Sequence, residues 1–364
     1  MILMNNFRAE PAALTEAMLA ATQRVLASGW YVLGKECQAF EQSWAAICGV
    51  THGVGVGNGM DAIEIALRAL GIGPGDEVIT TPMTAFATVL AVLRAGATPV
   101  LADIEPDTAL LSPASVERCL SPRTRAVVLV HLYGQLRGMP KWQALCREAG
   151  VALIEDCAQS HYATLGGQAA GSFGVAGAFS FYPTKNLGAA GDGGMLVTHD
   201  DTLAKKAAML RNYGQSERYH HPHVGLNSRL DEVHAAMLSA RLAWMDEFNA
   251  RRRAVARAYR ERLRHPEVHL MAPPEDDAAH VHHLFVVTSE RRHALQAHLQ
   301  ACGVQSLIHY PVPVHQQPPC KDLRTDPQGL STSERHAATC LSLPCHAQLT
   351  GAEVAKVIEA VNCF

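Results

Sequence analysis

The sequence has few charged residues, few aromatic residues and no long apolar run. Of its 364 residues 18% are charged and 6% aromatic, and the formal net charge is −3 with neutral histidines. This balance provides no basic surface for nucleic acid or for an anionic membrane. No apolar run is long enough to span a bilayer, and residues 1–11 lack a basic region followed by an apolar core. We therefore expect a cytoplasmic protein that binds neither nucleic acid nor membrane.

Cysteine and histidine spacing argues against disulfides and metal sites. The 10 cysteines are scattered without a Cys-x-x-Cys pair, which predicts reduced and mostly buried thiols. The 19 histidines include the runs 220–223 (HHPH) and 280–283 (HVHH). Neither run has a carboxylate or cysteine cluster at ligand spacing beside it, so we predict no bound metal.

The length and the alternation of elements predict an α/β protein with two domains. A chain of 364 residues exceeds a usual single core. Helix-like and strand-like segments alternate, which predicts a largely parallel sheet covered by helices. A long helical stretch at 230–263 precedes a mixed pattern, so we expect a large domain at 1–245 and a smaller α+β domain at 246–364. The expected early elements are helices 61–70, 84–95 and 140–149 and strands 78–81, 99–102, 126–131 and 151–155.

Lys185 and Asp156 provide the strongest chemical signal. Lys185 lies in the run 179–188 (FSFYPTKNLG), and Asp156 follows the short apolar strand pattern 151–154. A lysine amine attacks carbonyls only when it is partly unprotonated or stored as an imine, and pyridoxal 5'-phosphate provides that storage. This cofactor needs a carboxylate at its ring nitrogen, and ligands of open α/β sheets bind beyond the carboxyl ends of the strands. Taken singly, an aspartate that closes a strand is usually a helix cap or loop residue and a lone lysine is usually a surface residue, so the signal depends on their joint occurrence with the motifs below.

A glycine-rich turn offers a phosphate site. Residues 56–61 (VGNGMD) run directly into the helix expected at 61–70, so free amides and the positive helix end face the turn. Gly55 and Gly57 are followed by Met60 where a dinucleotide fingerprint needs a third glycine. The turn therefore suits a phosphate monoester, although Gly-Asn-Gly alone also fits an ordinary turn.

Ordered motifs extend this pattern over nearly the whole chain. They are 57–62 (GNGMDA), 155–161 (EDCAQSH), 185–188 (KNLG) with 191–194 (GDGG), 227–232 (NSRLDE) and 309–313 (HYPVP). With them the sequence resembles the DegT/DnrJ/EryC1/StrS sugar aminotransferases, pyridoxal-phosphate enzymes of the type I, aspartate aminotransferase-like fold. The segment 210–214 (LRNYG), then Tyr219 and 225–229 (GLNSR), is most similar to the branch that aminates C3 of nucleotide-linked 3-keto-6-deoxyhexoses.

The resemblance implies amino-group transfer by ping-pong kinetics. L-glutamate would be the donor, and dTDP-3-keto-6-deoxyhexose would become dTDP-3-amino-3,6-dideoxyhexose. Amination at C4 of a UDP- or GDP-linked keto sugar remains an alternative, as does a non-catalytic, cofactor-binding sensor. Related dehydratases have histidine where this chain has Lys185, which argues against that reaction. No helix-turn-helix or basic arm supports the sensor.

The resemblance also assigns the cofactor contacts. Lys185 would bind the cofactor covalently and later move the proton, while Asp156 would pair with the pyridinium nitrogen. Relatives complete the phosphate site with an asparagine from the partner subunit, which Asn227 matches, so a homodimer with shared active sites is implied. The remaining cofactor contacts would be Gln159 at the phenolic oxygen and, at the phosphate, Ser180 with the amides of Gly59 and Met60.

One position departs from the family pattern. Many relatives place an aromatic residue over the cofactor ring in the motif 83–88 (MTAFAT), and the matching position here is Ala85. Either Phe86 takes that place or the ring face is left to a smaller contact. Ordinary helix packing also explains Phe86.

His309, Tyr310 and His315 fall where relatives line the sugar-nucleotide pocket, and three further residues are candidates for substrate contact. For several of them a structural role fits about as well: His161 as a packed strand-end histidine, Tyr310 as part of a proline-rich loop, and Arg229 as a structural arginine at a helix start. The candidate substrate residues are His161, Tyr182, Arg229, His309, Tyr310 and His315.

Overall fold

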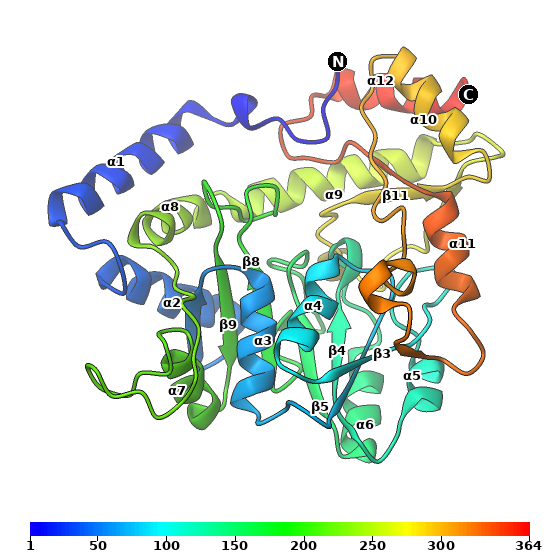
Figure 1. Cartoon of the computed structure of the whole chain (residues 1–364). Coiled ribbons are helices and arrows are strands. Elements are labelled where there is room, and N and C mark those ends of the chain that lie inside the picture. Colours follow the sequence, from blue (N-terminus) through cyan, green and yellow to red (C-terminus); the bar gives the residue numbers. More distant parts are fainter.

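An eight-stranded sheet forms the centre of the larger part of the molecule. The computed structural model describes residues 1–364, and Figure 1 shows the sheet with helices around it. Six neighbouring strands pair in parallel, in the order β8, β5, β4, β2, β3 and β12. Strand β9 runs antiparallel to both of its neighbours, β1 and β8. In sheet order the strands are β1 (His52–Val56), β9 (Gly194–Thr198), β8 (Ala176–Ser180), β5 (Ala152–Asp156), β4 (Thr124–Val130), β2 (Glu77–Thr80), β3 (Thr98–Leu101) and β12 (Arg324–Thr325).

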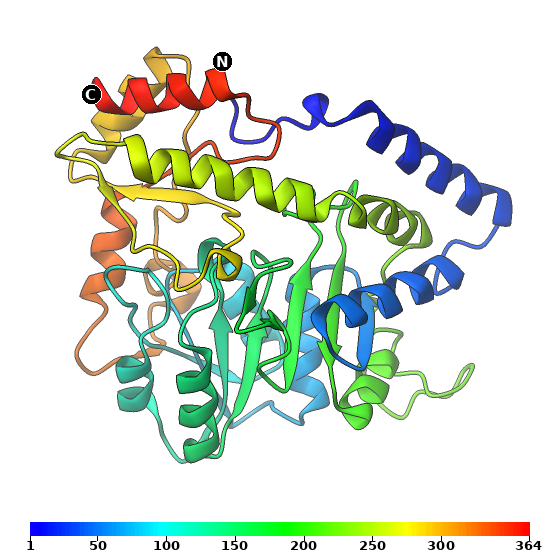
Figure 2. The same cartoon turned by 180° about the vertical axis from the view of Figure 1, so that it is seen from behind.

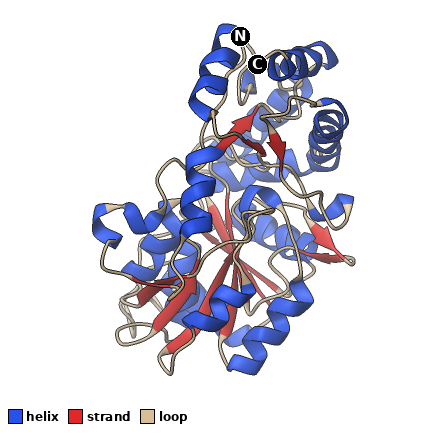
Figure 3. Ribbon diagram, turned by 90° about the vertical axis from the view of Figure 1, so that its right-hand side faces the viewer, coloured by secondary structure: helices blue, strands red, loops and turns tan.

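Helices cover both faces of this sheet (Figure 3). In β4, Ala126 and Val128 point into one apolar core, whereas Val127 and Leu129 point into the other. Burial on both faces explains why the central strands are continuously apolar rather than alternating. The helices of this part are α1 (Ala12–Ser28), α2 (Lys35–Cys48), α3 (Gly59–Ala69), α4 (Phe86–Arg94), α5 (Pro113–Cys119), α6 (Met139–Ala149), α7 (Asp201–Leu210) and α8 (Glu232–Leu242).

A smaller layer lies over one end of the sheet and contains both chain termini (Figures 1 and 2). Its three strands pair antiparallel and share a core with the helices packed on them. Thr350 and Glu353 form a capping box at the start of the last helix. The elements are β10 (His269–Leu270), β11 (Phe285–Thr288), β13 (Cys340–Leu343), α9 (Met245–Arg262), α10 (Arg292–Ala301), α11 (Ser331–Thr339) and α12 (Gly351–Asn362).

Short elements complete the chain. They include the hairpin of β6 (Thr164–Leu165) and β7 (Gln168–Ala169) and the 3₁₀ turns η1 (Phe7–Ala9), η2 (Leu132–Gly134), η3 (Asp277–Ala279), η4 (Val314–Gln316) and η5 (Pro318–Cys320). The cysteines are all free, and most are buried. None of the helices has the length and apolar character that crossing a membrane requires.

The fold confirms the α/β class expected from the sequence, with two differences in detail. The helical stretch expected at 230–263 is interrupted between α8 and α9 at Ala243 and Trp244. Chain segments also cross the proposed boundary at residue 245. β12 joins the large sheet beside β3, and Ile2 bridges to Val304 within the smaller part. The division into 1–245 and 246–364 therefore describes the main mass of each part and remains a prediction.

A partly buried ion pair and hydrogen bonds at a helix start attach the returning segment to the large sheet. Arg324 in β12 donates to Glu77 in β2 at 2.6 Å, and Asp103 accepts the amides of Thr332 and Ser333 at the start of α11. A carboxylate at a helix N-terminus satisfies amides that have no partner within the helix. Glu77 begins β2 and Asp103 follows β3, so the two contacts fix the returning segment at opposite ends of the parallel strands.

Candidate active site

Lys185 and Asp156 lie at the carboxyl ends of two adjacent parallel strands. Asp156 is the last residue of β5, and Lys185 lies in a turn after β8, where its amide donates to the carbonyl of Tyr182 at 2.8 Å. Burial lowers the pKa of the Lys185 amine to about 8, and the carboxylate of Asp156 opposes that shift. About a tenth of the amine is therefore unprotonated at pH 7, and a carbonyl nucleophile requires such a free amine.

Two threonines orient the carboxylate of Asp156. Its Oδ2 accepts a 2.8 Å hydrogen bond from the Thr88 hydroxyl, and its Oδ1 accepts from the amide of Ala158 at 3.1 Å. The Thr84 and Thr88 hydroxyl oxygens are 2.7 Å apart, and the single Thr88 proton goes to Asp156, so Thr84 is the donor in that pair. The sequence reasoning did not single out either threonine. Their spacing of one helical turn was the available signal.

The start of α3 forms a cradle beside these residues. Asn58 caps the helix by accepting from the amide of Asp61 at 2.8 Å, and the Gly59 and Met60 amides have no partner within the helix. A Cβ at Gly59 would lie 2.7 Å from Cβ of Ser180, so only glycine allows this approach. The cradle combines amide donors, a positive helix end and a serine hydroxyl, which fits a phosphate monoester.

Ser228 is a further residue at this cradle. Its hydroxyl accepts from the amide of Gly57 at 2.9 Å, so it fixes the turn that precedes α3. Asn227, its neighbour, is exposed and pairs with Asn212 through a backbone bridge. Ser228 lies in the motif 227–232, but the sequence alone assigned it no role.

Gln159 and Tyr310 lie together near Asp156. Gln159 donates to the Tyr310 hydroxyl oxygen at 3.3 Å. Burial, followed by the charge of Asp156, raises the pKa of Tyr310 to about 12, so the phenol keeps its proton at neutral pH. The structure therefore brings together Lys185, Asp156, Gln159, Ser180, Tyr310 and the start of α3.

Neutral histidines surround the Lys185 amine. Burial and the nearby charge of Lys185 lower the pKa of His309 to about 4, and its Nδ1 lies 2.8 Å from the Ser342 hydroxyl. The same causes lower the pKa of His283 well below its usual value, and its Nδ1 lies 3.2 Å from Oδ1 of Asn186. The sequence did not identify His283 and Asn186 as site residues, although His283 lies in the run 280–283 and Asn186 in the motif 185–188.

His161 lies in the aromatic core. Its ring is fully buried, with ring centroids 5.7 Å from Trp44, 5.5 Å from Phe179 and 5.8 Å from Phe181. Burial is the main cause that lowers the pKa of this imidazole to about 3. The structure therefore gives His161 the environment of a packed core histidine rather than that of an open pocket wall.

Ala85 and Phe86 lie at the start of α4. Ala85 is the N-cap residue, and Phe86 packs against an apolar cluster that includes Val89, Leu101 and Val314. This is the helix-packing environment considered for Phe86 from the sequence.

The other candidate substrate residues are dispersed. Tyr182 is 51% exposed, close to Lys185 in the chain. The guanidinium of Arg229 lies 5.2 Å from the ring centroid of Tyr213. His315 has its Nε2 3.0 Å from the carboxylate of Glu334. His309 and Tyr310 lie close to Lys185 and Asp156. His161, although enclosed by aromatic rings, is also near enough to Lys185 for the charge of that lysine to lower the His161 pKa.

A second buried carboxylate lies next to Asp156 in the sequence. Glu155 accepts amide hydrogen bonds from Gly171, Phe173 and Gly174 at 2.7 to 3.0 Å and lies 2.8 Å from Nε2 of His131. His131, Glu155 and Cys157 are close enough together to consider a metal. Glu155 already has a full set of donors, so we assign it a structural role in shaping the 171–174 loop.

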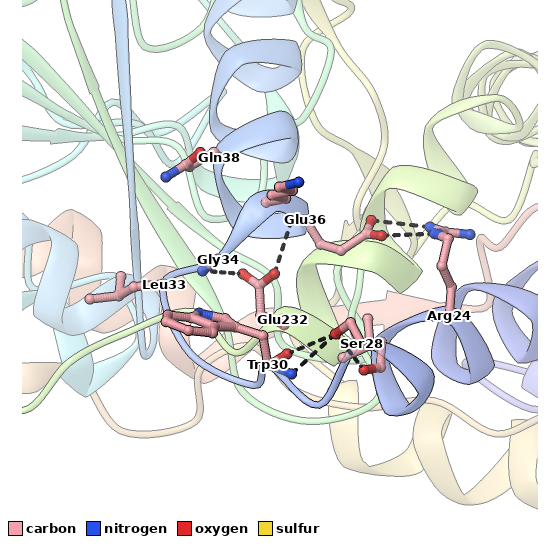
Figure 4. A pocket seen from close by; sticks show the side chains of 10 residues that line it. Arg24, Ser28, Trp30, Leu33, Gly34, Glu36, Gln38 and Glu232 are labelled. Carbon is pink, nitrogen blue, oxygen red and sulfur yellow. Dashed lines mark hydrogen bonds and ion pairs between the residues drawn. The ribbon is translucent and has the colours of Figure 1, made fainter.

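A cavity of about 660 Å³ lies away from this centre, among α1, α2 and the start of α8 (Figure 4). Glu232 accepts the amides of Gly34, Glu36 and Cys37 there and so caps α2. Trp30 on its rim is 62% exposed. None of the candidate catalytic residues lines this cavity.

Known proteins are similar to this chain over nearly its whole length. A transaminase of Streptomyces venezuelae named for dTDP-3-amino-3,4,6-trideoxy-alpha-D-glucose is 46% identical over 345 residues, covering 94% of this chain and 90% of that protein. The sensory transduction protein EryC1 of erythromycin biosynthesis, from Saccharopolyspora erythraea, is 46% identical over 348 residues, covering 94% of this chain and 93% of that protein.

A solved structure agrees over nearly the whole chain. The crystal structure of S. venezuelae DesV in complex with a ketimine intermediate superposes with a TM-score of 0.95 at 45% identity, covering 99% of this chain and 97% of that chain. The model of the DegT/DnrJ/EryC1/StrS aminotransferase family matches residues 12–362. This chain therefore belongs to the DegT/DnrJ/EryC1/StrS aminotransferase family.

Proposed function

We propose that the protein is a pyridoxal-phosphate-dependent sugar aminotransferase. It moves an amino group from L-glutamate to a nucleotide-linked keto sugar, and dTDP-3-keto-6-deoxyhexose is the proposed acceptor, giving dTDP-3-amino-3,6-dideoxyhexose. The observation that carries the proposal is Lys185, with a lowered pKa, beside the oriented carboxylate of Asp156 and the cradle at the start of α3. The 46% identity to a dTDP-amino-sugar transaminase supports the choice of acceptor.

The residues present fit the cofactor. Asp156 would hold a protonated ring nitrogen, Gln159 would donate to the phenolic oxygen, and Ser180 with the amides of Gly59 and Met60 would bind the phosphate. When bound, pyridoxal phosphate supplies an electron sink that stabilises negative charge on the substrate carbon. Support for this fit comes from Gly59, where a Cβ would occupy the space between the helix start and Ser180.

Lys185 moves the proton in each half of the proposed reaction. Its amine takes the proton from the α-carbon of glutamate and returns a proton to the sugar carbon during amination. A base with a pKa of about 8 suits this work near neutral pH, because it is readily regenerated after each transfer. The surrounding neutral histidines add no competing positive charge to the site.

We propose that the sugar nucleotide binds over the segment 309–315. His309 and Tyr310 approach Lys185 and Asp156, while Tyr182 and His315 lie farther out. Arg229 is the proposed contact for the diphosphate, because a guanidinium offers several donors to anionic oxygens. His161 is left out of this proposed pocket because its ring is enclosed by aromatic side chains.

We also propose a homodimer in which Asn227 completes the partner's phosphate site. The exposed aromatic residues Trp30, Tyr31, Tyr213 and Tyr219 are 45% to 77% exposed in the single chain, and a second copy would cover such residues. Subunit mixing tests the shared site. Lys185→Ala and Asn227→Ala are each expected to be inactive, while their heterodimer regains one complete site. Lack of recovery in a demonstrated heterodimer would count against the shared site.

The chemical proposal is tested by product formation. With L-glutamate alone, the cofactor-loaded protein should form about one equivalent of 2-oxoglutarate per chain, because a ping-pong enzyme stops after the first half-reaction. Adding dTDP-, UDP- or GDP-linked keto sugars in turn identifies the acceptor by continued turnover and by the position of the new amine. The cytoplasmic location expected from the sequence remains a prediction.

One relative's name favours a sensor as the alternative function, since it describes a sensory transduction protein. A sensor would bind the cofactor without forming 2-oxoglutarate. Absence of that product in cofactor-loaded protein would therefore favour the sensor over the aminotransferase.

A further inference from the structure

Tyr133 connects the proposed active site to the smaller part of the molecule. It lies in the η2 turn after β4, is 2% exposed, and has a backbone φ of 64°. A residue other than glycine adopts this left-handed conformation at a cost, so the surrounding contacts must hold it there. In this conformation the Tyr133 amide contacts Gln159, while the Tyr133 hydroxyl contacts His309 and His336.

The amide of Tyr133 fixes the orientation of Gln159. It donates to Oε1 of Gln159 at 2.6 Å. An N–H only donates, so Oε1 is the acceptor and the Gln159 Nε2 group is left to donate. That group donates to the Tyr310 hydroxyl oxygen at 3.3 Å. Gln159 therefore presents donors toward Tyr310 and the region of Asp156.

The hydroxyl of Tyr133 fixes the segment that contains Tyr310. It donates to the carbonyl of His309 at 2.7 Å and lies 2.8 Å from Nε2 of His336 in α11. A carbonyl only accepts, so the single hydroxyl proton goes to His309 and Nε2 of His336 must carry the proton that it donates to Tyr133. Burial lowers the pKa of His336 to about 4, which leaves this ring neutral and able to hold that tautomer.

We propose that Tyr133 is a positioning residue that sets Gln159 and Tyr310 for cofactor and sugar binding. This inference rests on the proposed function. In the resulting hydrogen-bond chain, His336 donates to Tyr133, Tyr133 donates to His309 and to Gln159, and Gln159 donates to Tyr310. Because Tyr310 accepts from Gln159 in this chain, its own hydroxyl proton stays free for a ligand in the site.

Tyr133→Phe removes the hydroxyl but keeps the backbone amide and the ring. Its control is Tyr259→Phe, because Tyr259 is also fully buried and donates to a carbonyl, that of Pro344, at 2.8 Å. Tyr259→Phe loses the bond to Pro344, whereas Tyr133→Phe loses the bond to His309 and the bond from His336, so Tyr133→Phe should lose at least as much stability. Only Tyr133→Phe releases the segment that holds Tyr310.

Two readouts separate positioning from stability. We expect Tyr133→Phe to raise KM for the keto sugar about tenfold while kcat changes less, since a lost hydrogen bond of ordinary strength has that effect. The pH midpoint of the visible absorbance of the bound cofactor should also shift by about half a unit, because the Tyr310 hydroxyl that Gln159 contacts is no longer held in place. Tyr259→Phe should leave both quantities at wild-type values.

Variants of His336 test the same chain from its other end. His336→Leu removes the donor to Tyr133 and should reproduce the KM increase, while His336→Gln keeps an N–H donor and should restore KM toward the wild-type value. If Tyr133→Phe and His336→Leu both retain wild-type KM and pH midpoint, the positioning role is wrong. A wild-type protein without cofactor absorbance or 2-oxoglutarate formation would instead overturn the proposed function.

Discussion

Thr88 in α4 donates its hydroxyl proton to Oδ2 of Asp156, at the end of β5, across 2.8 Å, and both side chains are buried. Hydrogen bonds to charged groups contribute about 1.5 to 3 kcal/mol. We expect Thr88→Val to reduce kcat/KM for the keto sugar by about 10- to 100-fold, because Asp156 would lose its orientation toward the cofactor ring.

Thr80→Val is the matched control for this change. Thr80 is equally buried, but its hydroxyl donates to the carbonyl of Val128 at 2.9 Å and not to the site. Steady-state kinetics with the keto sugar compares kcat/KM of the two variants. Equal kcat/KM in Thr88→Val and Thr80→Val would show that the Thr88 bond has no catalytic importance.

Gly59→Ala should weaken cofactor binding. The added Cβ would lie 2.7 Å from Cβ of Ser180, so the helix start and the serine must separate. We expect at least about a tenfold increase in the dissociation constant of pyridoxal phosphate, which corresponds to the loss of one or two phosphate hydrogen bonds. Titration of the cofactor-free protein measures this constant.

Gly351→Ala is the control, because Gly351 is also the first residue of a helix but has open space where the Cβ would stand. It should bind the cofactor normally and gain up to about 1 kcal/mol of unfolding free energy. If Gly59→Ala binds the cofactor as tightly as Gly351→Ala does, the start of α3 is not the phosphate site.

Glu155→Gln should destabilise the fold more than it affects the chemistry. The buried carboxylate accepts three backbone amides of the 171–174 loop, and a glutamine would turn one acceptor oxygen into a donor facing them. We expect a loss of about 2 to 4 kcal/mol in the free energy of unfolding. Urea denaturation of the cofactor-free protein measures it.

Glu290→Gln provides the reference, since its ion pair with Arg335 is exposed on both sides and contributes little. A Glu155→Gln variant as stable as Glu290→Gln would refute the structural role of Glu155.

Lys185 should reduce the stability of the cofactor-free protein at neutral pH. Burial lowers the amine pKa from 10.5 to about 8, so the folded state disfavours the charged amine. The unfolded chain binds more protons between these two values, and stability should therefore rise with pH across that interval.

We expect Lys185→Met to increase the unfolding free energy by up to ~3 kcal/mol below pH 8. This advantage should decline as the pH rises and disappear above the ordinary lysine pKa. Denaturation of both cofactor-free proteins over this pH range provides the comparison. A difference that does not depend on pH would contradict the lowered pKa.

The strands expected from the sequence match β2, β3, β4 and β5 of the large sheet, whereas β1, β8, β9 and β12 were not predicted. Apolar runs such as β4 and β5 are continuous because helices cover both faces, and the strand end then places Asp156 beside the turn that contains Lys185. The phosphate site was predicted from a glycine-rich turn that runs into a helix, and the structure adds that a Cβ at Gly59 would lie too close to Ser180.

Other features depend on contacts between distant segments and leave no local pattern. Tyr133 and His336 meet only because the chain returns through β12 to the large sheet. Glu155 and Asp156 are adjacent acidic residues, yet Glu155 contacts the 171–174 loop and Asp156 contacts Thr88 in the candidate site. The identity of the two residues does not indicate this difference. The aromatic enclosure of His161 also results from tertiary packing.

The most direct test of the account is an absorbance spectrum of the wild-type protein and of Lys185→Ala, each with pyridoxal phosphate, before and after L-glutamate is added. We expect the wild type to show a band near roughly 410–420 nm that falls on addition of glutamate as 2-oxoglutarate is released, while Lys185→Ala releases no product. A wild-type protein without that band, or with a band that glutamate leaves unchanged, would contradict the aminotransferase function.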